Sequence, residues 1–589
     1  MFNMLLFTPF TLRARTLLLA CLPVIFVAVA EAQVVSPGAV EPQRSSPALP
    51  APVDDSLIQV PAPSAREGGT TTHIDVSRID VQPEGDTGGM DMQVTLDAEA
   101  LAERMRHELS GSLSFVQLEN IAVALTDFYR GQDLLLATAY LPAQDVVDGI
   151  VVIKVLPGFL ESVAVENNDM YRSGIVRRPF EQSVGGPIST STTETAMLRL
   201  NDMPGMRAAA LFKPGEALGT SRLAISVEEE DPLDFSAQVD NYGVEATGEV
   251  RLLLGVDVNN ISGHIDQLSV DAVKTFSSGD LKYGRVAYQI THPDLVHTLS
   301  LSHSETDYDV QRGQSALGIE GDTSIGEALL TSQWVRSRNF NLASRFGLAL
   351  KRAEVEFSKF DFRQGVDKLS VFELGLVADH IDIEWRGIHR ATLSYFRGVD
   401  EFIGSMDSNG DSRALRQGAS GRFSPGDFDK LTASYMRLQS LATDHSLLLR
   451  LRGQYSDDVL SSLEQMSLGG PYSVRAYPVS EHVKDKGVFA SLAWVINGSI
   501  LGDDPVYDDY SWADLLSVSV FFDYGQGSLN DPQPAQDKSV DIAGAGVELD
   551  LRFPKQNAFA RLSVAAPTTN LDARNDEDFQ YWIAIGANF

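Results

Sequence analysis

The chain has 589 residues, which is enough for several domains or for one large barrel with smaller units attached. Its 80 acidic residues outnumber its 47 basic ones and leave a net charge of −33, which argues against nucleic-acid binding. Cys21 is the single cysteine and lies in a segment that we expect to be removed, so the mature chain has no disulfide framework and no thiol chemistry.

The first 32 residues have the pattern of a secretory signal peptide. Arg13 and Arg15 precede a short apolar run from Leu17 to Ala30, which ends in small residues. The four residues ending at Cys21 also resemble a lipobox, but the apolar run continues beyond Cys21 and favours an ordinary signal peptide over 1–32. No later apolar stretch has the length of a transmembrane helix, so membrane insertion requires a closed barrel.

A proline-rich segment follows the signal peptide, and a small α+β unit follows that segment. Residues 33–68 contain seven prolines and predict an extended, semi-rigid linker. Hydrophobic periodicity then predicts a unit over 69–158 with the order strand, helix, helix, strand, strand. Its expected elements are His73–Val81, Leu101–Leu109, Phe115–Tyr129, Leu134–Tyr140 and Gly149–Leu156.

The same order of elements repeats over residues 159–231. The expected elements of this second unit are Phe159–Val165, Ile175–Pro179, Thr190–Leu200, Met206–Phe212 and Ser221–Glu228. Two such units in series are typical of periplasmic interaction domains, because an open sheet edge can accept an extended polypeptide as an added strand. The alternative is that both units are spacers.

From residue 232 to 589 helical periodicity disappears, and runs of about ten residues alternate apolar and polar side chains. We count about sixteen such runs, an even number typical of bacterial outer-membrane barrels. Short connections alternate with long ones such as Val399–Asp427, as periplasmic turns alternate with external loops. Clear runs include Arg251–Val258, Gln267–Phe276, Tyr283–Ile290, His297–His303, Leu342–Leu350, Leu369–Ala378, Arg390–Phe396 and Ser446–Tyr455.

The last strand and a polar trio in an earlier strand each have a distinctive pattern. The final strand places aromatic and branched side chains on one lipid-facing face and ends on an aromatic residue, as expected of a barrel assembly signal: Tyr581, Ile583, Ile585 and Phe589. His380, Asp382 and Glu384 alternate along a strand and share a face, so they are either metal ligands or, as we favour, a polar lumen wall.

The stretch Gly469–Pro478 is built for a tight and fixed shape, because glycines permit unusual backbone angles and prolines restrict theirs. Arg475 lies at its centre between two tyrosines, and a buried arginine requires a carboxylate partner. Asp523, within the strand Val518–Gly525, is the candidate partner. No nucleophile elbow, phosphate loop or zinc-protease helix is present, so we predict neither an enzyme nor a cofactor site.

These features together resemble the two-partner secretion transporters of the haemolysin secretion/activation type. The resemblance covers nearly all of the chain beyond the linker. Matching residues of the two polypeptide-transport-associated (POTRA) domains are Tyr140, Leu141, Pro142, Gln144 and Gly149 in the first and Pro204 and Gly205 in the second. Those of the long loop and its wall motif are Gly469, Gly470, Pro471, Tyr472, Val474, Arg475, Ala476 and Tyr477, with Phe521, Asp523 and Gly525.

The resemblance implies a mainly β protein, with two α+β POTRA domains before a 16-stranded antiparallel transmembrane β-barrel. It implies that a loop over about 456–486 folds back into the lumen, where Arg475 pairs with Asp523. The implied function is ATP-independent export of an unfolded partner across the bacterial outer membrane. The implied partners are a large secreted TpsA-type exoprotein (an adhesin, a haemolysin or similar), outer-membrane lipid, the barrel-assembly machinery and periplasmic chaperones.

The chain departs from the family pattern at two places, and two other functions remain as alternatives. Ala476 stands where the family motif usually has glycine, so a positive-φ conformation there would be strained. The family often has an N-terminal helix that plugs the pore, but proline breaks helices, and 33–68 is either a linker or such a plug region. An insertion factor for other barrels and a porin-like channel are the alternative functions; the repeated POTRA unit and its signature favour secretion.

Overall fold

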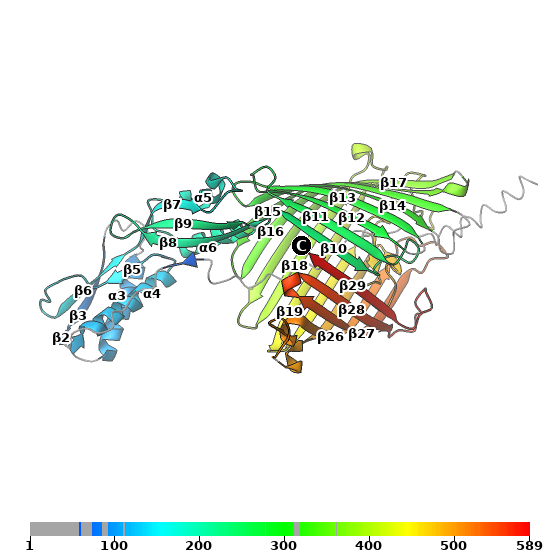
Figure 1. The fold of residues 1–589 in the computed structure, drawn as a ribbon. Coiled ribbons are helices and arrows are strands. Elements are labelled where there is room, and N and C mark those ends of the chain that lie inside the picture. The colour runs from blue at the N-terminus through cyan, green and yellow to red at the C-terminus, as the bar shows by residue number, and fades with distance from the viewer. Residues whose placement is uncertain are drawn as a thin grey trace, which may run out of the picture.

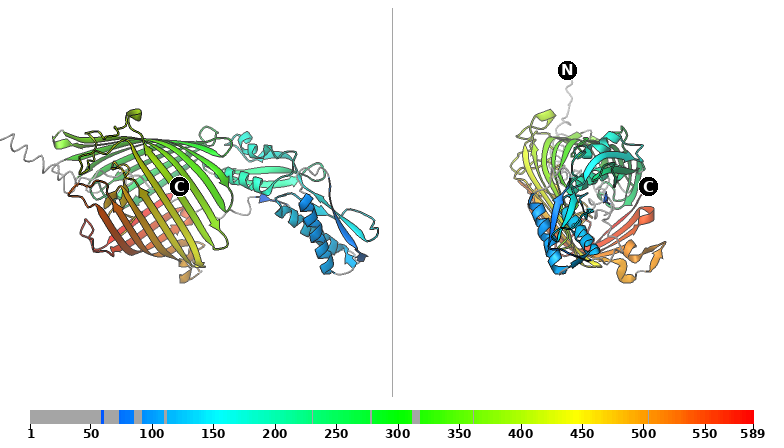
Figure 2. Two further views of the ribbon diagram at one scale, coloured as in Figure 1. Left: turned by 180° about the vertical axis from the view of Figure 1, so that it is seen from behind. Right: turned by 90° about the vertical axis from the view of Figure 1, so that its left-hand side faces the viewer.

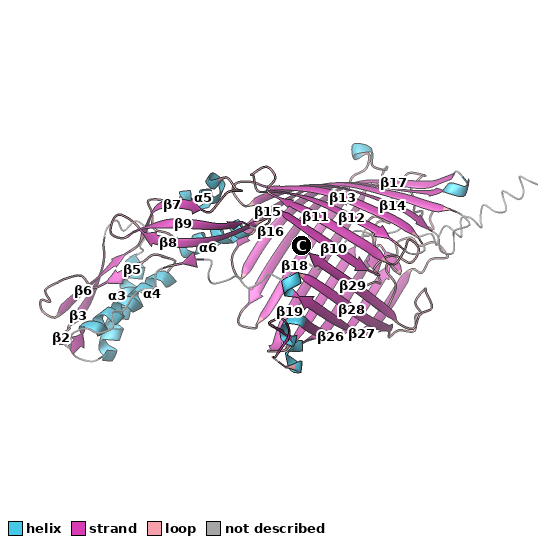
Figure 3. Cartoon of the chain, viewed as in Figure 1, coloured by secondary structure: helices cyan, strands magenta, loops and turns pink. Residues whose placement is uncertain are grey.

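The computed structural model describes residues 58–60, 73–84, 92–109, 112–229, 231–276, 279–310, 318–360, 362–502 and 504–589. The signal peptide expected over 1–32 lies outside the described residues, as does the expected linker apart from 58–60. Two small α+β units extend from one end of a large barrel (Figure 1). The barrel wall and the extended units are also clear from behind and from the end (Figure 2), and nearly all of the helix lies in the units (Figure 3).

The first unit packs two helices against a three-stranded sheet of order β3-β6-β5, in which β3 and β6 are parallel. Ser114 begins α4 with a capping box that includes Gln117, which satisfies backbone donors at the helix start. A separate ladder joins β2 to β4. The elements are β2 (His73–Asp75), β3 (Arg78–Pro83), α3 (Met92–Leu109), β4 (Ser112–Ser114), α4 (Phe115–Gly131), β5 (Thr138–Tyr140) and β6 (Ile150–Leu156).

Two expected strands of the first unit are shorter than the sequence pattern indicates. The strand expected over His73–Val81 is broken, because Ser77 turns the chain and donates its backbone N–H to the carbonyl of Gly149 at 2.7 Å. The strand expected over Leu134–Tyr140 begins only at Thr138. Leu135 instead donates its N–H to the carbonyl of Ile188 at 3.1 Å, so this segment joins the two units.

The second unit has a four-stranded sheet of order β1-β8-β9-β7, covered by α5 and α6. Its outermost strand comes from the segment expected to be a linker: Ile58 lies opposite Ala210 and Gln59 opposite Leu211, in parallel register. The elements are β1 (Ile58–Gln59), β7 (Phe159–Glu166), α5 (Ser173–Glu181), α6 (Thr190–Asn201), β8 (Met206–Pro214) and β9 (Thr220–Glu229).

The barrel comprises sixteen antiparallel strands within the described residues and closes where β10 pairs with β29. The predicted fold class and strand number are therefore confirmed. The wall strands are β10 (Leu233–Asp240), β11 (Arg251–Asn259), β12 (Asp266–Thr275), β13 (Asp280–Thr291), β14 (His297–Val310), β15 (Ile319–Arg336), β16 (Phe340–Phe357), β17 (Phe362–Asp382), β18 (Gly387–Gly398), β19 (Phe428–Ala442), β20 (His445–Tyr455), β23 (Lys486–Asn497), β26 (Leu516–Ser528), β27 (Ser539–Phe553), β28 (Ala558–Pro567) and β29 (Gln580–Asn588).

Side chains alternate along the wall, with exposed apolar residues outside. Leu374 and Leu376 of β17 are exposed on the outer face, as a lipid-facing strand requires. His380 has the same parity, is exposed, and packs its ring 6.4 Å from that of Phe340. The lumen-wall prediction for His380, Asp382 and Glu384 is therefore wrong: the first two share the outer face, and Glu384 falls in the turn after β17.

The connections differ between the two ends of the barrel. Those at the end bearing the α+β units are short, as in 337–339, 383–386 and 443–444. One connection departs from this rule, since residues 498–515 carry η4 (Gly498–Leu501), β24 (Pro505–Tyr507), β25 (Tyr510–Ser511) and α7 (Trp512–Leu515). The long loops 399–427 and 456–485 lie at the opposite end, and the other short helices are η2 (Ser358–Phe360), η3 (Phe402–Gly404) and η5 (Pro554–Gln556).

Candidate functional site

The loop between β20 and β23 contains a small hairpin, in which β21 (Met466–Leu468) pairs with β22 (His482–Lys484). The tip of this loop, residues 469–481, packs against inward-facing side chains of the barrel wall. The loop therefore folds back into the lumen. Gly469 and Gly470 have φ of 101° and 98°, and a Cβ at Gly469 would collide with the carbonyl of Pro478. Only glycine suits these two positions.

Backbone hydrogen bonds close the tip on itself. Gly470 donates its N–H to the carbonyl of Tyr477 at 2.9 Å, and Ser473 donates to the carbonyl of Gly470 at 3.0 Å. Tyr477 in turn donates its N–H to the carbonyl of Val474 at 3.1 Å. The tip is thus a compact structure, with Arg475 presented from its centre.

Arg475 meets Asp523 of β26 in a bidentate ion pair. Its Nε donates to Oδ2 and its Nη2 to Oδ1, both at 2.8 Å, and its backbone N–H donates to Oδ2 at 3.1 Å. Arg475 is 2% exposed and Asp523 is fully buried. A buried, bidentate, charge-assisted pair is both strong and geometrically specific. We name this pair the tip lock.

Three further wall residues complete the surroundings of the guanidinium. Its carbon lies 3.2 Å from the ring centre of Phe521, a cation–π contact in a desolvated place. Nη2 donates to the hydroxyl of Ser491 on β23 at 3.2 Å, and Nη1 donates to Glu548 on β27 at 3.3 Å. The arginine is thereby tied to three neighbouring strands.

Ala476 fits the wall because the wall has a glycine opposite it. A Cβ at Gly544 of β27 would collide with the Cβ of Ala476, so the two positions share the space of one methyl group. Ala476 is fully buried and is not among the described residues with positive φ. The strain considered for Ala476 from the sequence therefore does not arise.

Neighbouring tip residues are fixed in a similar way. A Cβ at Gly525 would lie 2.9 Å from Val474, so the wall glycine admits the valine. The hydroxyl of Tyr477 lies 2.8 Å from that of Thr569 and donates to the carbonyl of Leu571 at 2.9 Å. Tyr472, next to Pro471, packs edge-on against Tyr242, with ring centres 5.6 Å apart.

The base of the loop is held by two buried carboxylates that were not predicted from the sequence. Glu464 is buried between Lys351 of β16, 2.8 Å away, and Lys430 of β19, with which it also forms an ion pair. Asp485 accepts Arg416 Nη2 at 2.8 Å and the backbone N–H of Asn530 at 2.6 Å. Asp485 thus joins this loop to the loops 399–427 and 529–538, and we name both sites the neck locks.

The α+β units contain the other predicted site residues. Tyr140 donates its hydroxyl to Glu84, which also pairs with Lys154 at 2.7 Å, and these hydrogen bonds lower the pKa of the Glu84 carboxyl. Gln144 donates to the carbonyl of Val152 and accepts its N–H, both at 2.7 Å. The Gln144 amide therefore pairs with β6 as a neighbouring strand would.

The remaining signature residues form turns or contact the barrel. Leu141 packs against the core of the first unit beside Pro142, and Gly149 has φ of 70°. The carbonyl of Pro204 accepts the hydroxyl of Tyr171. Gly205 has φ of 73° and lies against Asn259 of β11, so a side chain there would press on the barrel.

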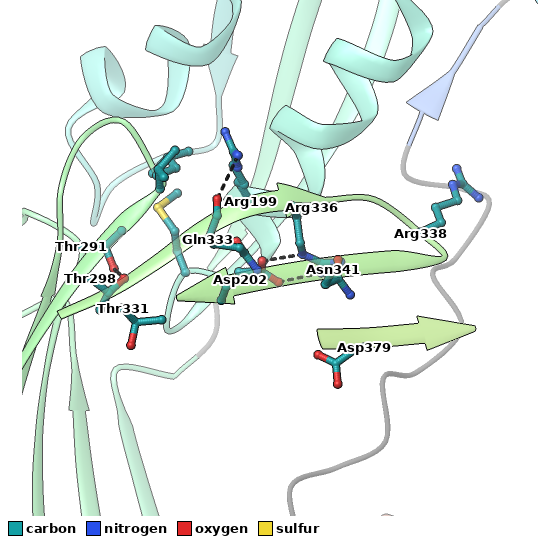
Figure 4. A pocket seen from close by; sticks show the side chains of 14 residues that line it. Arg199, Asp202, Thr291, Thr298, Thr331, Gln333, Arg336, Arg338, Asn341 and Asp379 are labelled. Atoms are coloured by element: carbon teal, nitrogen blue, oxygen red, sulfur yellow. Dashed lines mark hydrogen bonds and ion pairs between the residues drawn. The ribbon is translucent and has the colours of Figure 1, made fainter. Parts of the chain in front are cut away.

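The second unit is attached to the barrel by ion pairs beside a cavity of about 500 Å³ (Figure 4). Arg336 at the end of β15 donates to both oxygens of Asp202, at 2.7 and 2.8 Å. Arg338 pairs with Glu194 of α6. These contacts hold α6 against the end of the barrel wall at the β15–β16 turn.

The C-terminal strand presents its predicted face outward. Tyr581, Ile583, Ile585 and Phe589 are all exposed, whereas the alternate residue Trp582 is buried inside the barrel. The outward face is the one that lipid would contact.

The sequence comparisons point to one group of proteins. The model of the family "Haemolysin secretion/activation protein ShlB/FhaC/HecB" matches residues 219–551, and that of "POTRA domain, ShlB-type" matches residues 90–158. The heme/hemopexin transporter protein HuxB of Haemophilus influenzae (strain 86-028NP) is 24% identical over 495 residues, covering 83% of this chain and 84% of HuxB.

Two further similarities concern proteins named CdiB. The outer membrane transporter CdiB of Dickeya dadantii is 25% identical over 367 residues, covering 61% of this chain and 63% of that protein. The solved structure of CdiB from Escherichia coli has the same fold, with a TM-score of 0.65 and 19% sequence identity, covering 90% of this chain and 92% of that one.

Proposed function

The chain belongs to the haemolysin secretion/activation protein family ShlB/FhaC/HecB, and from this premise we propose how it exports a secreted partner protein through its barrel. It is a two-partner secretion transporter of the outer membrane, with an ShlB-type POTRA domain before the barrel. We assign 69–158 and 159–231 to two POTRA domains and 232–589 to the barrel. The partner is a large exoprotein of the TpsA type, which arrives unfolded, and the transporter has no catalytic role.

The second POTRA domain receives the partner by strand addition at the edge of β8. A short parallel strand, Ile58–Gln59, already pairs there with Ala210 and Leu211. This pairing supports the proposal, because it demonstrates that the edge accepts an extended segment from outside the domain. The ion pairs of Arg336 and Arg338 keep that edge near the barrel entrance.

The tip lock, formed by Arg475 and Asp523, is the observation that carries the proposed mechanism. It holds the loop inside the lumen in one conformation, and the partner chain passes when the loop moves or yields space. Direction comes from folding of the partner outside the cell. Outer-membrane lipid contacts the outward apolar belt, and the barrel-assembly machinery and periplasmic chaperones deliver the barrel through its C-terminal strand.

The experiment is a comparison of proteins released by a strain that lacks this chain with those released by its parent. We expect one large exported protein to disappear from the medium and to return when the intact chain is supplied. The matched control is the chain carrying Asp457→Ala, because Asp457 lies on the loop but is 72% exposed at its side chain. An unchanged medium, with assembly of other outer-membrane barrels impaired, would overturn the proposal in favour of an insertion factor.

A further inference from the structure

The barrel closes at its shortest ladder. Regular pairing of β10 with β29 runs from Ser236 opposite Asn588 to Asp240 opposite Ala584, flanked by backbone hydrogen bonds between Phe235 and Phe589 and from Asn241 to Ile583. By contrast, β16 and β17 pair from Phe340 to Phe357 along nearly their whole length. Among the wall ladders in the described residues, the closing seam is the shortest, so side-chain contacts across it can add appreciably to its closure.

The tip of the lumenal loop touches both sides of this seam. Tyr242 follows β10 by two residues, and its ring lies edge-on to Tyr472 of the tip at 5.6 Å and edge-on to Trp582 of β29 at 6.0 Å. Trp582 also donates its indole N–H to the backbone carbonyl of Arg475 at 2.8 Å. The three rings form one buried cluster, in which the loop tip bridges the first and last strands.

Polar contacts fix the first strand's contribution to that cluster. Asp240 accepts Nε of Arg251 at 2.8 Å and the backbone N–H of Tyr242 at 3.0 Å, which sets the direction of the chain after β10. Between them, Asn241 accepts the N–H of Ile583 at 2.7 Å and donates its side-chain amide to the carbonyl of Tyr581 at 2.8 Å. The side chain of Asn241 therefore extends the seam where the regular ladder ends.

We propose that Tyr242 and Trp582 are positioning residues that couple the tip lock to closure of the seam. While Arg475 is held by Asp523, the tip holds β10 and β29 together through these rings; when the tip is displaced, the seam loses that support. Coupling of this kind is reciprocal, so a closed seam also stabilises the docked tip. The consequence during export rests on the proposed function, whereas the coupling itself is a property of the empty transporter.

The first test measures hydrogen–deuterium exchange of the purified full-length protein without any partner. Trp582→Phe keeps an aromatic ring but removes the N–H donor to Arg475. We expect amides of β10 and β29 to exchange about five to ten times faster, the effect of losing roughly one hydrogen bond, while β16 and β17 stay unchanged. The control is Trp494→Phe, since Trp494 is an exposed tryptophan of β23 that contacts His445 instead of the loop.

The second test works in the reverse direction and leaves every cluster residue intact. Val239 and Ile585 lie directly opposite each other across the seam, and both face outward. Cysteines at these two positions meet the distance requirement of a disulfide, and Cys21 is the only native cysteine. Oxidation should slow exchange of the tip amides 470–477 several-fold, and reduction should restore it.

Two results would overturn the coupling: seam exchange that is unchanged in Trp582→Phe, or tip exchange that is the same with the disulfide closed and open. Neither readout involves secretion. Loss of the coupling in a protein that still exports normally would therefore reject this inference alone. Intact coupling, together with a deletion strain that releases the same proteins as its parent, would reject the proposed function alone.

Discussion

The lumenal loop packs on the inner face of the barrel sheet, and the short strand β1 pairs with the edge of the second unit's sheet. The two segments are held by different kinds of interaction. The loop tip has a buried bidentate ion pair, and its base has two further buried carboxylates with cationic partners. β1 has two residues paired with the edge of β8 and partial burial of Ile58 and Val60. Buried charges with fitted partners specify one position, whereas backbone pairing at an edge accepts any extended chain.

The difference in energy is large. Breaking one partner of a buried ion pair costs about 3–5 kcal/mol, because the other charge stays buried and uncompensated. A net backbone hydrogen bond contributes only about 1 kcal/mol. The loop should therefore stay docked until a specific event releases it, while the occupant of the β8 edge should exchange readily with the partner chain.

The largest expected effect comes from Asp523→Ala, which leaves Arg475 buried without its main acceptor. We expect the docked state of the tip to lose about 3–5 kcal/mol and its amides to exchange far faster. Hydrogen–deuterium exchange of residues 470–477 checks this. Glu548→Gln is the matched control, since Glu548 contributes one longer contact of 3.3 Å and is partly exposed. Equal, small effects from both variants would show that the tip is held by packing alone.

Glu464→Gln should have the next largest effect, because Lys351 and Lys430 would lose the buried carboxylate that lies between them. We expect a loss of about 3 kcal/mol in the stability of the loop base. Proteolysis of the loop in the folded barrel reports it. The control is Asp457→Ala, whose exposed pair with Lys486 is worth about 0–1 kcal/mol. A Glu464 variant as resistant to proteolysis as this control would contradict the role of the neck locks.

Gly544→Ala should have an intermediate effect, since the new methyl group would collide with Ala476. Overpacking of this kind costs about 1–3 kcal/mol. Adding Ala476→Gly removes the collision and should restore part of the loss, which thermal unfolding of the single and double variants measures. If the second change gave no recovery, the two positions would not share one space.

The smallest effect is expected at β1. Ile58→Asp removes the apolar contact of this strand with the second POTRA domain and should free the edge of β8. Amides of β8 should then exchange a few-fold faster, which corresponds to about 1 kcal/mol, with unchanged unfolding of the domain. The matched control is Leu218→Asp, an exposed apolar residue of the β8–β9 turn. If the β8 amides exchanged as slowly in Ile58→Asp as in Leu218→Asp, β1 would not be the weakly held segment that we expect.

The sequence predicts the architecture well because periodicity records which face of an element is buried. Alternation gave a count of about sixteen wall strands and located eight clear ones. The family motifs pointed to Arg475 and Asp523 as partners, which lie 48 positions apart and meet in the lumen. The neck locks have no such signal. Lys351 lies more than a hundred positions before Glu464, and a lysine in an alternating strand indicates neither its depth nor its partner.

Other misses have local causes. The sequence could not tell whether His380 lies on the outer or the lumenal face of β17. Alternation shows which residues share a face but not which face is the lumen. β1 consists of two residues within a proline-rich stretch, too short for any periodic pattern. The cluster of Tyr242, Tyr472 and Trp582 joins three distant segments that only barrel closure brings together.

The most direct test of the tip lock is the amount of partner protein released by cells that carry Arg475→Ala or Asp523→Ala. Our account predicts that secretion is abolished in both, while the amount of barrel in the outer membrane and its resistance to unfolding in detergent stay near those of the intact chain. Secretion at the normal level by both variants would contradict the requirement for a held loop.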